Sequence, residues 1–166
     1  MSYIELKESG AAYMPVNIAH VNGRKMQVFD FMVDTGATRT MIPQYALMDY
    51  LGFTEDYILK NRQIIPPKSS PKMANGEPMN VYRIPITRMN IFGHEIQHNY
   101  VLSSDTANVG YLLGLDILSY FNFAFNFDAI SDDVPFGKMF LKFRKSRQQD
   151  FSNLGDSFAY RLDENN

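Results

Sequence analysis

The chain has 166 residues, of which 45% are hydrophobic and 20% are charged, which is typical of one globular domain with a sizeable core. The formal net charge of −2 gives no general attraction for nucleic acid or for an anionic membrane surface, so we expect neither as a partner. The absence of cysteine excludes a disulfide scaffold, a thiolate metal site and a cysteine nucleophile.

The three histidines offer little to a metal ion. His94 and His98 are close in sequence, but the alternation around Gly93 predicts a strand, where their spacing does not have the meaning it has on a helix. We interpret both as surface histidines and expect no metal and no other cofactor.

The beginning of the sequence, residues 1–7, lacks the basic start and the long apolar run of a signal peptide. No stretch approaches membrane-spanning length. We therefore expect a cytoplasmic location, unless a targeting segment has been removed from a precursor.

The first predicted element is a β-hairpin. Apolar residues alternate over residues 15–21 and 24–29, and Asn22-Gly23 between them suits a tight turn. The second strand is expected to continue through Phe31-Met32-Val33 into the interior. A short helix is predicted over about residues 43–51, with Pro43 at its first position and Gly52 ending it.

Residues 54–80 are predicted to be loop-like, because prolines, serines and Asn75-Gly76 interrupt any regular pattern. A second hairpin is predicted from Val81 through a turn at Phe92-Gly93-His94 to Leu102. Phenylalanines then recur at every second position from Phe121 to Phe127, which predicts one buried strand face. A last strand is expected at 139–143, and residues 146–166 form a polar tail.

The most informative segment is Phe31-Met32-Val33-Asp34-Thr35-Gly36-Ala37-Thr38, an apolar run that stops at a carboxylate. The following Thr-Gly pair predicts a tight turn with two backbone N–H groups free to face an anion. A second apolar run, Leu112-Leu113-Gly114-Leu115-Asp116-Ile117-Leu118, also follows a hairpin and precedes a short helix. The likeness of the two halves favours a mostly β fold with pseudo-twofold symmetry.

These two motifs, each preceded by a hairpin, resemble the retropepsin-like aspartic proteases, the single-domain family that includes retroviral proteases and their cellular and bacterial relatives. The resemblance covers roughly residues 13–143. It implies a closed β-barrel with one or two short helices and a flap hairpin, active as a C2 homodimer. The protease domain would span residues 1–145.

The resemblance also implies the roles of individual residues. Asp34 falls at the catalytic position. Thr35 would bury its hydroxyl in a bond across the dimer, and Gly36 would let its backbone approach the carboxylate and the substrate. Ala37 would continue the substrate-facing wall. Gly114 would pack behind the active-site loop, where a side chain would collide.

Three further assignments follow from the family pattern. Asn75 and Gly76 fall at the tip of the flap, within Ala74-Asn75-Gly76-Glu77, and would contact substrate. Asp116, at the start of the helix, is interpreted as a cap or a brace to the loop rather than a second catalytic acid. The proline-rich segment before the flap tip and the tail are longer than in compact retroviral members.

The implied function is that of an aspartic endopeptidase acting on a peptide or protein substrate. A single carboxylate is a poor catalyst of amide hydrolysis, and this chain supplies one such loop, so the site would need two copies of Asp34. Terminal strands near residues 3–6 and 138–141 are the candidate interface. Asp30, before the apolar run, is interpreted as a solvated or bridging residue.

Two classes of phosphotransfer enzyme also place an aspartate after an apolar strand. Actin-like ATPases need a second phosphate loop and a much longer chain, and haloacid dehalogenases need a second aspartate where this chain has Gly36. Both are excluded. One alternative stays open, a catalytically silent homodimeric module that binds peptides or scaffolds an assembly. Self-processing within the tail also stays open.

Overall fold

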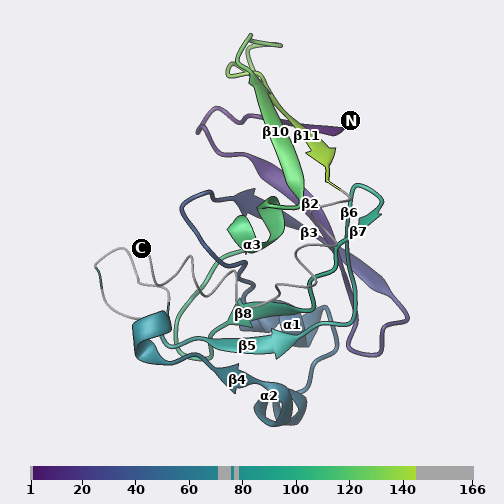
Figure 1. The fold of residues 1–166 in the computed structure, drawn as a ribbon, viewed down its shortest axis with the longest axis vertical. Coiled ribbons are helices and arrows are strands. Elements are labelled where there is room, and N and C mark those ends of the chain that lie inside the picture. The colour runs from purple at the N-terminus through teal and green to yellow at the C-terminus, as the bar shows by residue number, and fades with distance from the viewer. Residues whose placement is uncertain (1, 71–75, 77–78, 145–166) are drawn as a thin grey trace.

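The computed structural model describes residues 2–70, 76 and 79–144, and strands form most of its regular structure (Figure 1). The strands are β1 (Ser2–Glu5), β2 (Tyr13–Ala19), β3 (Met26–Val33), β4 (Gln63–Ile64), β5 (Tyr82–Pro85), β6 (Met89–Ile91), β7 (His94–Glu95), β8 (Tyr100–Ser103), β9 (Leu112–Leu113), β10 (Phe121–Asn126) and β11 (Lys138–Phe143). The helices are α1 (Gln44–Asp49), α2 (Glu55–Asn61) and α3 (Leu115–Leu118), with a short 3-10 turn η1 (Pro67–Ser69). None of these helices is long and apolar enough to cross a bilayer.

The first predicted hairpin is confirmed. β2 and β3 pair antiparallel from Tyr13↔Met32 to Ala19↔Met26, and Gly23 in the turn between them has φ +73°. Every second side chain of β2 points into the core, as the period of a strand requires. Met14, Val16 and Ile18 are all 0% exposed.

Two sheets join to form the barrel. One has the order β7-β6-β2-β3-β9, and the other has the order β4-β5-β8. Met41 connects them, because it bridges to Leu102 in β8 and to Leu112 in β9. The chain also passes directly from β5 in one sheet to β6 in the other. The predicted mostly β fold with few short helices is confirmed.

The predicted helix at residues 43–51 is confirmed as α1, with Pro43 as its N-cap rather than its first helical residue. The prediction of a loop from residue 54 was wrong at its start, because α2 occupies residues 55–61. Thr54 Oγ1 accepts a hydrogen bond from Tyr57 N at 3.1 Å and caps this helix. Glu55 and Asp56 follow in its first turn, where acidic side chains are favourable. The prolines that suggested a loop lie beyond the end of this helix.

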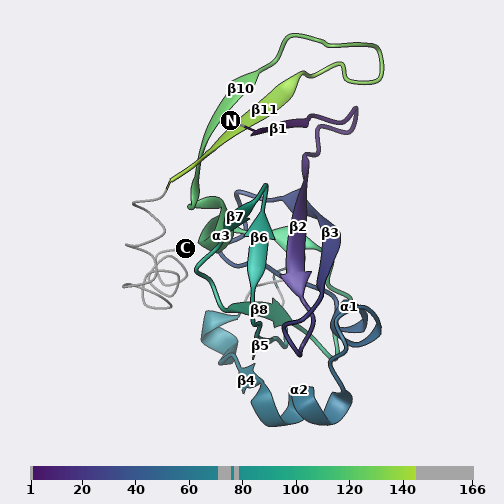
Figure 2. The ribbon, with the colours of Figure 1, turned by 90° about the vertical axis from the view of Figure 1, so that its right-hand side faces the viewer.

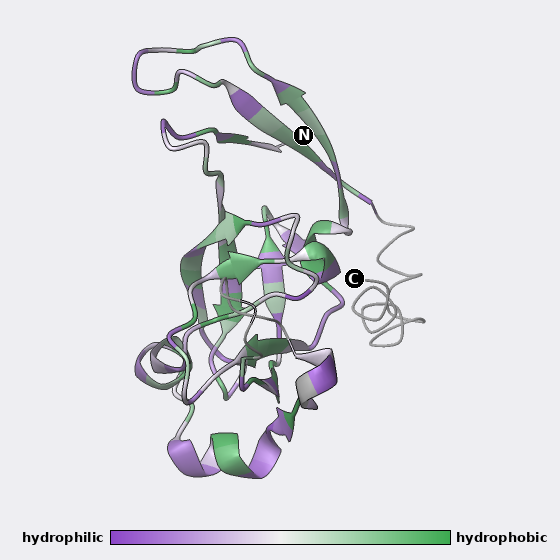
Figure 3. Ribbon diagram, turned by 90° about the vertical axis from the view of Figure 1, so that its left-hand side faces the viewer, coloured by the Kyte–Doolittle hydropathy of each residue, from purple (hydrophilic) through white to green (hydrophobic). Residues whose placement is uncertain are grey.

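The third sheet, β1-β11-β10, projects from the barrel (Figures 1 and 2). Apolar stretches continue from the barrel strands into this projection (Figure 3). The prediction that the phenylalanines form one buried face is wrong in part. Phe121 is 4% exposed, but Phe125 is 52% exposed and Phe127 is 70% exposed. The alternating pattern correctly indicated a strand. However, β10 and the residues that follow it extend beyond the barrel, which therefore does not cover their side chains.

The two terminal strands named as interface candidates pair with each other within the chain. β1 lies antiparallel to β11, with Ser2 opposite Leu141 and Glu5 opposite Lys138. β11 is therefore the central strand of this sheet, and β1 and β10 form its edges. The predicted tail, residues 146–166, lies outside the described residues.

Candidate active site

Asp34 stands directly after the last residue of β3. The parallel neighbour β9 fixes this end of the strand, since Asp34 N donates to Leu113 O at 3.0 Å and Met32 N donates to Tyr111 O at 2.9 Å. The Asp34 residue is half-buried, whereas Thr35 and Gly36 are exposed in the single chain. The structure thus presents a carboxylate and a short loop at the surface of a rigid strand pair.

The loop after Asp34 folds back on the carboxylate. Gly36 N donates to Asp34 Oδ1 at 3.0 Å, and Ala37 N donates to Asp34 O at 3.1 Å. The sequence predicted that N–H groups of the Thr35-Gly36 pair would face an anion, and the Gly36 N–H faces the carboxylate of Asp34 itself. A Cβ on Gly36 would lie 3.2 Å from Asp34 Oδ1, tighter than most real contacts, so glycine allows this close approach.

The second motif packs tightly behind this loop. A Cβ on Gly114 would lie 2.6 Å from the carbonyl carbon of Arg39, 2.7 Å from its oxygen and 2.8 Å from its nitrogen. Backbone atoms can therefore meet there only because residue 114 has no side chain. Leu115 N donates to Ala37 O at 2.9 Å and Asp116 N donates to Thr38 O at 3.1 Å, so the start of α3 holds the loop in place.

Asp116 braces the same loop through its side chain, as the sequence suggested. Its Oδ1 accepts from Thr40 Oγ1 at 2.7 Å and from Ile117 N at 2.9 Å, and its Oδ2 accepts from Thr40 N at 3.0 Å. Thr40 Oγ1 in turn accepts from Gly114 N at 3.1 Å. The Asp116 residue is 2% exposed, so it is not available to react with a substrate.

The interpretation of His98 as a surface residue was wrong. His98 is 6% exposed, and its Nε2 lies 3.3 Å from Asp116 Oδ2, a contact that is an ion pair only when the imidazole is protonated. His94 is half-buried and stacks on Phe143, with ring centroids 4.3 Å apart. Within the described ranges, no group of three or more His, Asp or Glu side chains could hold a metal ion.

A second apolar cluster lies beside the segment that follows the loop. It is separate from the main core, and Met41 joins it to the strand that ends at Leu113. Its buried members are Met41, Ile65, Val81, Tyr100, Leu102 and Val109, with Met79, Ala107 and Leu112 packed against them.

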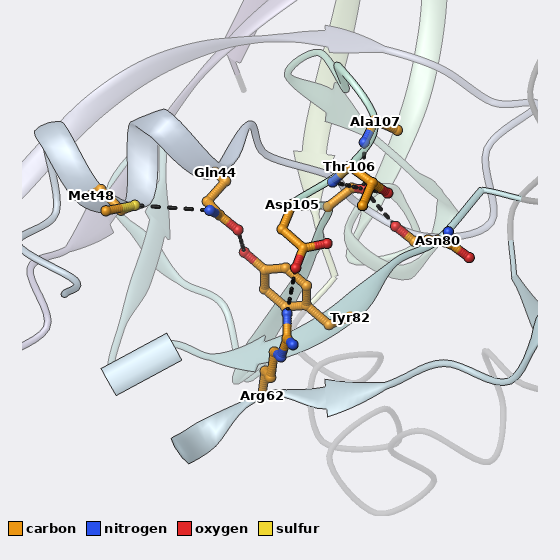
Figure 4. Close-up of polar contacts among 9 residues, drawn as sticks. Gln44, Met48, Arg62, Asn80, Tyr82, Asp105, Thr106 and Ala107 are labelled. Atoms are coloured by element: carbon orange, nitrogen blue, oxygen red, sulfur yellow. Dashed lines mark hydrogen bonds and ion pairs between the residues drawn. The ribbon is translucent and has the colours of Figure 1, made fainter. Parts of the chain in front are cut away.

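The base of the predicted flap hairpin is formed by β4 and β5, which pair antiparallel with Gln63 opposite Arg83. Figure 4 shows its anchoring to neighbouring segments: Arg62 Nη1 contacts Asp105 Oδ2 at 2.9 Å, and Tyr82 Oη donates to Gln44 Oε1 at 2.6 Å. Burial raises the pKa of the Tyr82 hydroxyl above its ordinary value.

A second link to the flap base runs through Ser104, whose Oγ donates to Asn80 O at 2.5 Å. The same Oγ accepts from Thr106 N at 3.2 Å and from Ala107 N at 2.9 Å (Figure 4). At the predicted tip, Gly76 is exposed with φ +85°, and Asn75 lies outside the described residues.

Sequence reasoning found Asp34, the loop and Gly114, and the structure brings these together. It missed Thr40 and His98 as partners of Asp116, and Arg62 and Asp105 at the flap base. Thr40 and Asp116 are 76 positions apart, so no local pattern could indicate their contact.

Comparison with known proteins identifies the family. The profile of the family described as "gag-polyprotein putative aspartyl protease" matches residues 18–120, which include both motifs. A retropepsin-like aspartic protease from Rickettsia conorii has a similar structure, with a TM-score of 0.52 and 20% identity over 83% of this chain and 85% of that chain. EIAV protease, solved with the inhibitor HBY-793, matches with a TM-score of 0.45 and 19% identity over 64% of this chain and 84% of that one. None of the curated proteins compared with the chain matches it. The chain belongs to this family of aspartyl proteases, and its fold is retropepsin-like.

Proposed function

We propose that this protein is an aspartic endopeptidase that hydrolyses peptide bonds with a water held between two Asp34 carboxyls, one from each subunit of a homodimer. The observation that carries the proposal is the position of Asp34. It is a half-buried carboxylate at the end of a fixed strand, followed by the exposed residues Thr35 and Gly36, within the segment that matches the family.

The chemistry requires a second carboxyl. One group must be ionised to accept a proton from the attacking water, and the other must be protonated to polarise the scissile carbonyl. Two carboxyls about 3 Å apart meet this need. Repulsion between two negative charges at this distance makes double ionisation unfavourable, so the pair shares one proton. Asp116, the other aspartate near the loop, is fully engaged as a brace. A twofold axis between two copies of Asp34 would supply the missing group.

The remaining assignments belong to the same proposal. Thr35, exposed in the single chain, would hydrogen-bond across the dimer and become buried there. Gly36 and Ala37 would line the substrate backbone, and Asn75 and Gly76 would close over it from the flap. The apolar composition of the two motifs fits the preference of the family for apolar side chains near the scissile bond.

A degenerate peptide library, incubated with the protein between about pH 4 and 7, tests this function. We expect cleavage by the unmodified protein and none by Asp34→Asn. Asp30→Asn is the matched control, because Asp30 is an exposed aspartate on the same strand and should leave cleavage unchanged. Cleavage that survives Asp34→Asn would refute the assignment, and peptide binding without cleavage by the unmodified protein would favour the silent binding module.

Dilution tests the two-chain site separately. Activity per chain should fall once the concentration drops below the dimer dissociation constant, as followed by sedimentation of the same samples. Constant activity per chain in a sample that sediments only as monomer would contradict the shared site.

A further inference from the structure

Three buried polar residues from separate parts of the chain meet behind the Asp34 loop. Thr40 ends the segment that follows the loop, His98 lies between β7 and β8, and Asp116 is in the first turn of α3. They are 0%, 6% and 2% exposed, respectively. Buried polar groups are costly unless partnered, so a cluster of this kind holds its members in a defined arrangement.

The Asp116 carboxylate is the centre of the cluster. Three hydrogen bonds from Thr40 Oγ1, Thr40 N and Ile117 N fix it from the side of the loop and the helix. The Nε2 of His98 lies 3.3 Å from Oδ2. A proton on Nε2 makes this contact attractive, whereas a bare nitrogen would face the carboxylate oxygen with its lone pair.

The surroundings of His98 hold its backbone in place. Gln97 O accepts from Tyr120 Oη at 2.9 Å, and Asn99 O accepts from Ile86 N at 2.9 Å. The imidazole also packs on Tyr100, with ring centroids 4.4 Å apart. The backbone is therefore anchored on both sides of His98, and the ring packs on Tyr100 with its Nε2 toward Asp116.

We propose that His98 is a positioning residue for the catalytic loop, which it supports by holding the Asp116 carboxylate against Thr40. This inference rests on the proposed function. The connection runs from Nε2 to Asp116, from Asp116 to Thr40, and from Thr40 to the loop that carries Asp34. The same carboxylate is joined to Gly114 through Thr40 Oγ1, so it holds both segments of the site together.

The test compares substitutions that differ in the donor at the position of Nε2. His98→Gln keeps an N–H donor at the corresponding distance from the backbone, and His98→Met keeps a similar length and apolar volume without a donor. His98→Asn keeps a polar amide that ends one carbon short, and it replaces the methionine variant if that one does not fold. His94→Met is the control, because His94 stacks on Phe143 at a half-buried position away from this cluster.

The first readout is hydrogen exchange of the backbone amides of residues 36–40, followed without substrate. We expect exchange in His98→Met or His98→Asn to be faster by about tenfold, while His98→Gln stays within about threefold of the unmodified protein. His94→Met should not change it. If exchange is accelerated equally in His98→Gln, the ring contributes only through packing. If exchange is not accelerated in any His98 variant, His98 does not support the loop. Either result would overturn the proposal.

The second readout is steady-state peptide hydrolysis. A positioning role predicts that kcat falls by about tenfold in the methionine variant with KM nearly unchanged, and that the glutamine variant recovers most of it. In an Asp116→Ala background the methionine and glutamine variants should no longer differ, because the carboxylate that would accept from residue 98 is gone. A persistent difference there would contradict action through Asp116. If the unmodified protein cleaves nothing, the proposed function fails, and the exchange measurement still decides the role of His98 in the loop.

Discussion

The crossing of Gly114 over Arg39 gives the sharpest prediction about the site. An alanine at position 114 would put its Cβ 2.6 Å from the Arg39 carbonyl carbon, where ordinary contacts begin at 3.4 Å. The two segments would therefore have to separate by about 0.8 Å. Residue 114 has φ −95°, so backbone strain adds nothing and the destabilisation comes from the collision.

Separating the segment at Gly114 from the segment at Arg39 would break hydrogen bonds. Hydrogen bonds from Leu115 N to Ala37 O, from Asp116 N to Thr38 O and from Gly114 N to Thr40 Oγ1 join them at 2.9, 3.1 and 3.1 Å. Overpacking in a rigid core costs about 1–3 kcal/mol, and a collision with backbone on both sides belongs at the upper end. We expect Gly114→Ala to lower the free energy of unfolding by about 3 kcal/mol and the melting temperature by about 6–12 °C.

Urea unfolding followed by circular dichroism measures this difference, with Gly110→Ala as the matched control. Gly110 is exposed, has no atom within 4 Å of a built Cβ and does not have a positive φ. Its substitution should leave stability unchanged or raise it by up to about 1 kcal/mol. If Gly114→Ala is as stable as the unmodified protein to within about 0.5 kcal/mol, the tight packing of the second motif behind the loop is refuted.

Three further substitutions test other contacts of the structure. Thr40→Val keeps the shape of the side chain, but it leaves Gly114 N without its acceptor and removes one of the two donors to Asp116 Oδ1. The free energy of unfolding should fall by about 2–4 kcal/mol, against less than about 1 kcal/mol for Thr87→Val, whose hydroxyl hydrogen bond is exposed. Gly137→Ala should lower the melting temperature clearly more than Gly93→Ala. Both glycines have φ above +80°, but a Cβ at Gly137 would lie 1.9 Å from Asn126 O, whereas a Cβ at Gly93 would meet nothing within 4 Å. Equal costs would contradict the described turn. Burial raises the pKa of Tyr82 above 10.0, so above about pH 10 the unfolded chain loses this proton first and stability falls as pH rises. In urea titrations at alkaline pH, the free energy of unfolding of Tyr82→Phe should fall less steeply with pH than that of the unmodified protein. An unchanged slope would contradict the burial of this hydroxyl.

Local patterns in the sequence predicted the parts of the fold that neighbouring residues specify. Alternation with period two and Asn22-Gly23 sufficed for the β2–β3 hairpin, because side-chain direction and turn geometry depend on adjacent residues. The same rules identified the strand that ends just before Asp34. Where local signals conflicted, the prediction failed: the capped helix at residues 55–61 was hidden by the prolines that follow it.

The sequence by itself determined that an aspartate follows an apolar run and precedes a glycine turn, because both are properties of consecutive residues. Only the tertiary structure decided what holds that aspartate in place. His98 was interpreted as exposed, yet it is buried against Asp116, and Phe127 was interpreted as buried, yet it is 70% exposed. Burial depends on which distant segment covers a residue. The contact of Thr40 with Asp116 spans 76 positions, a distance over which periodicity and turn chemistry carry no information.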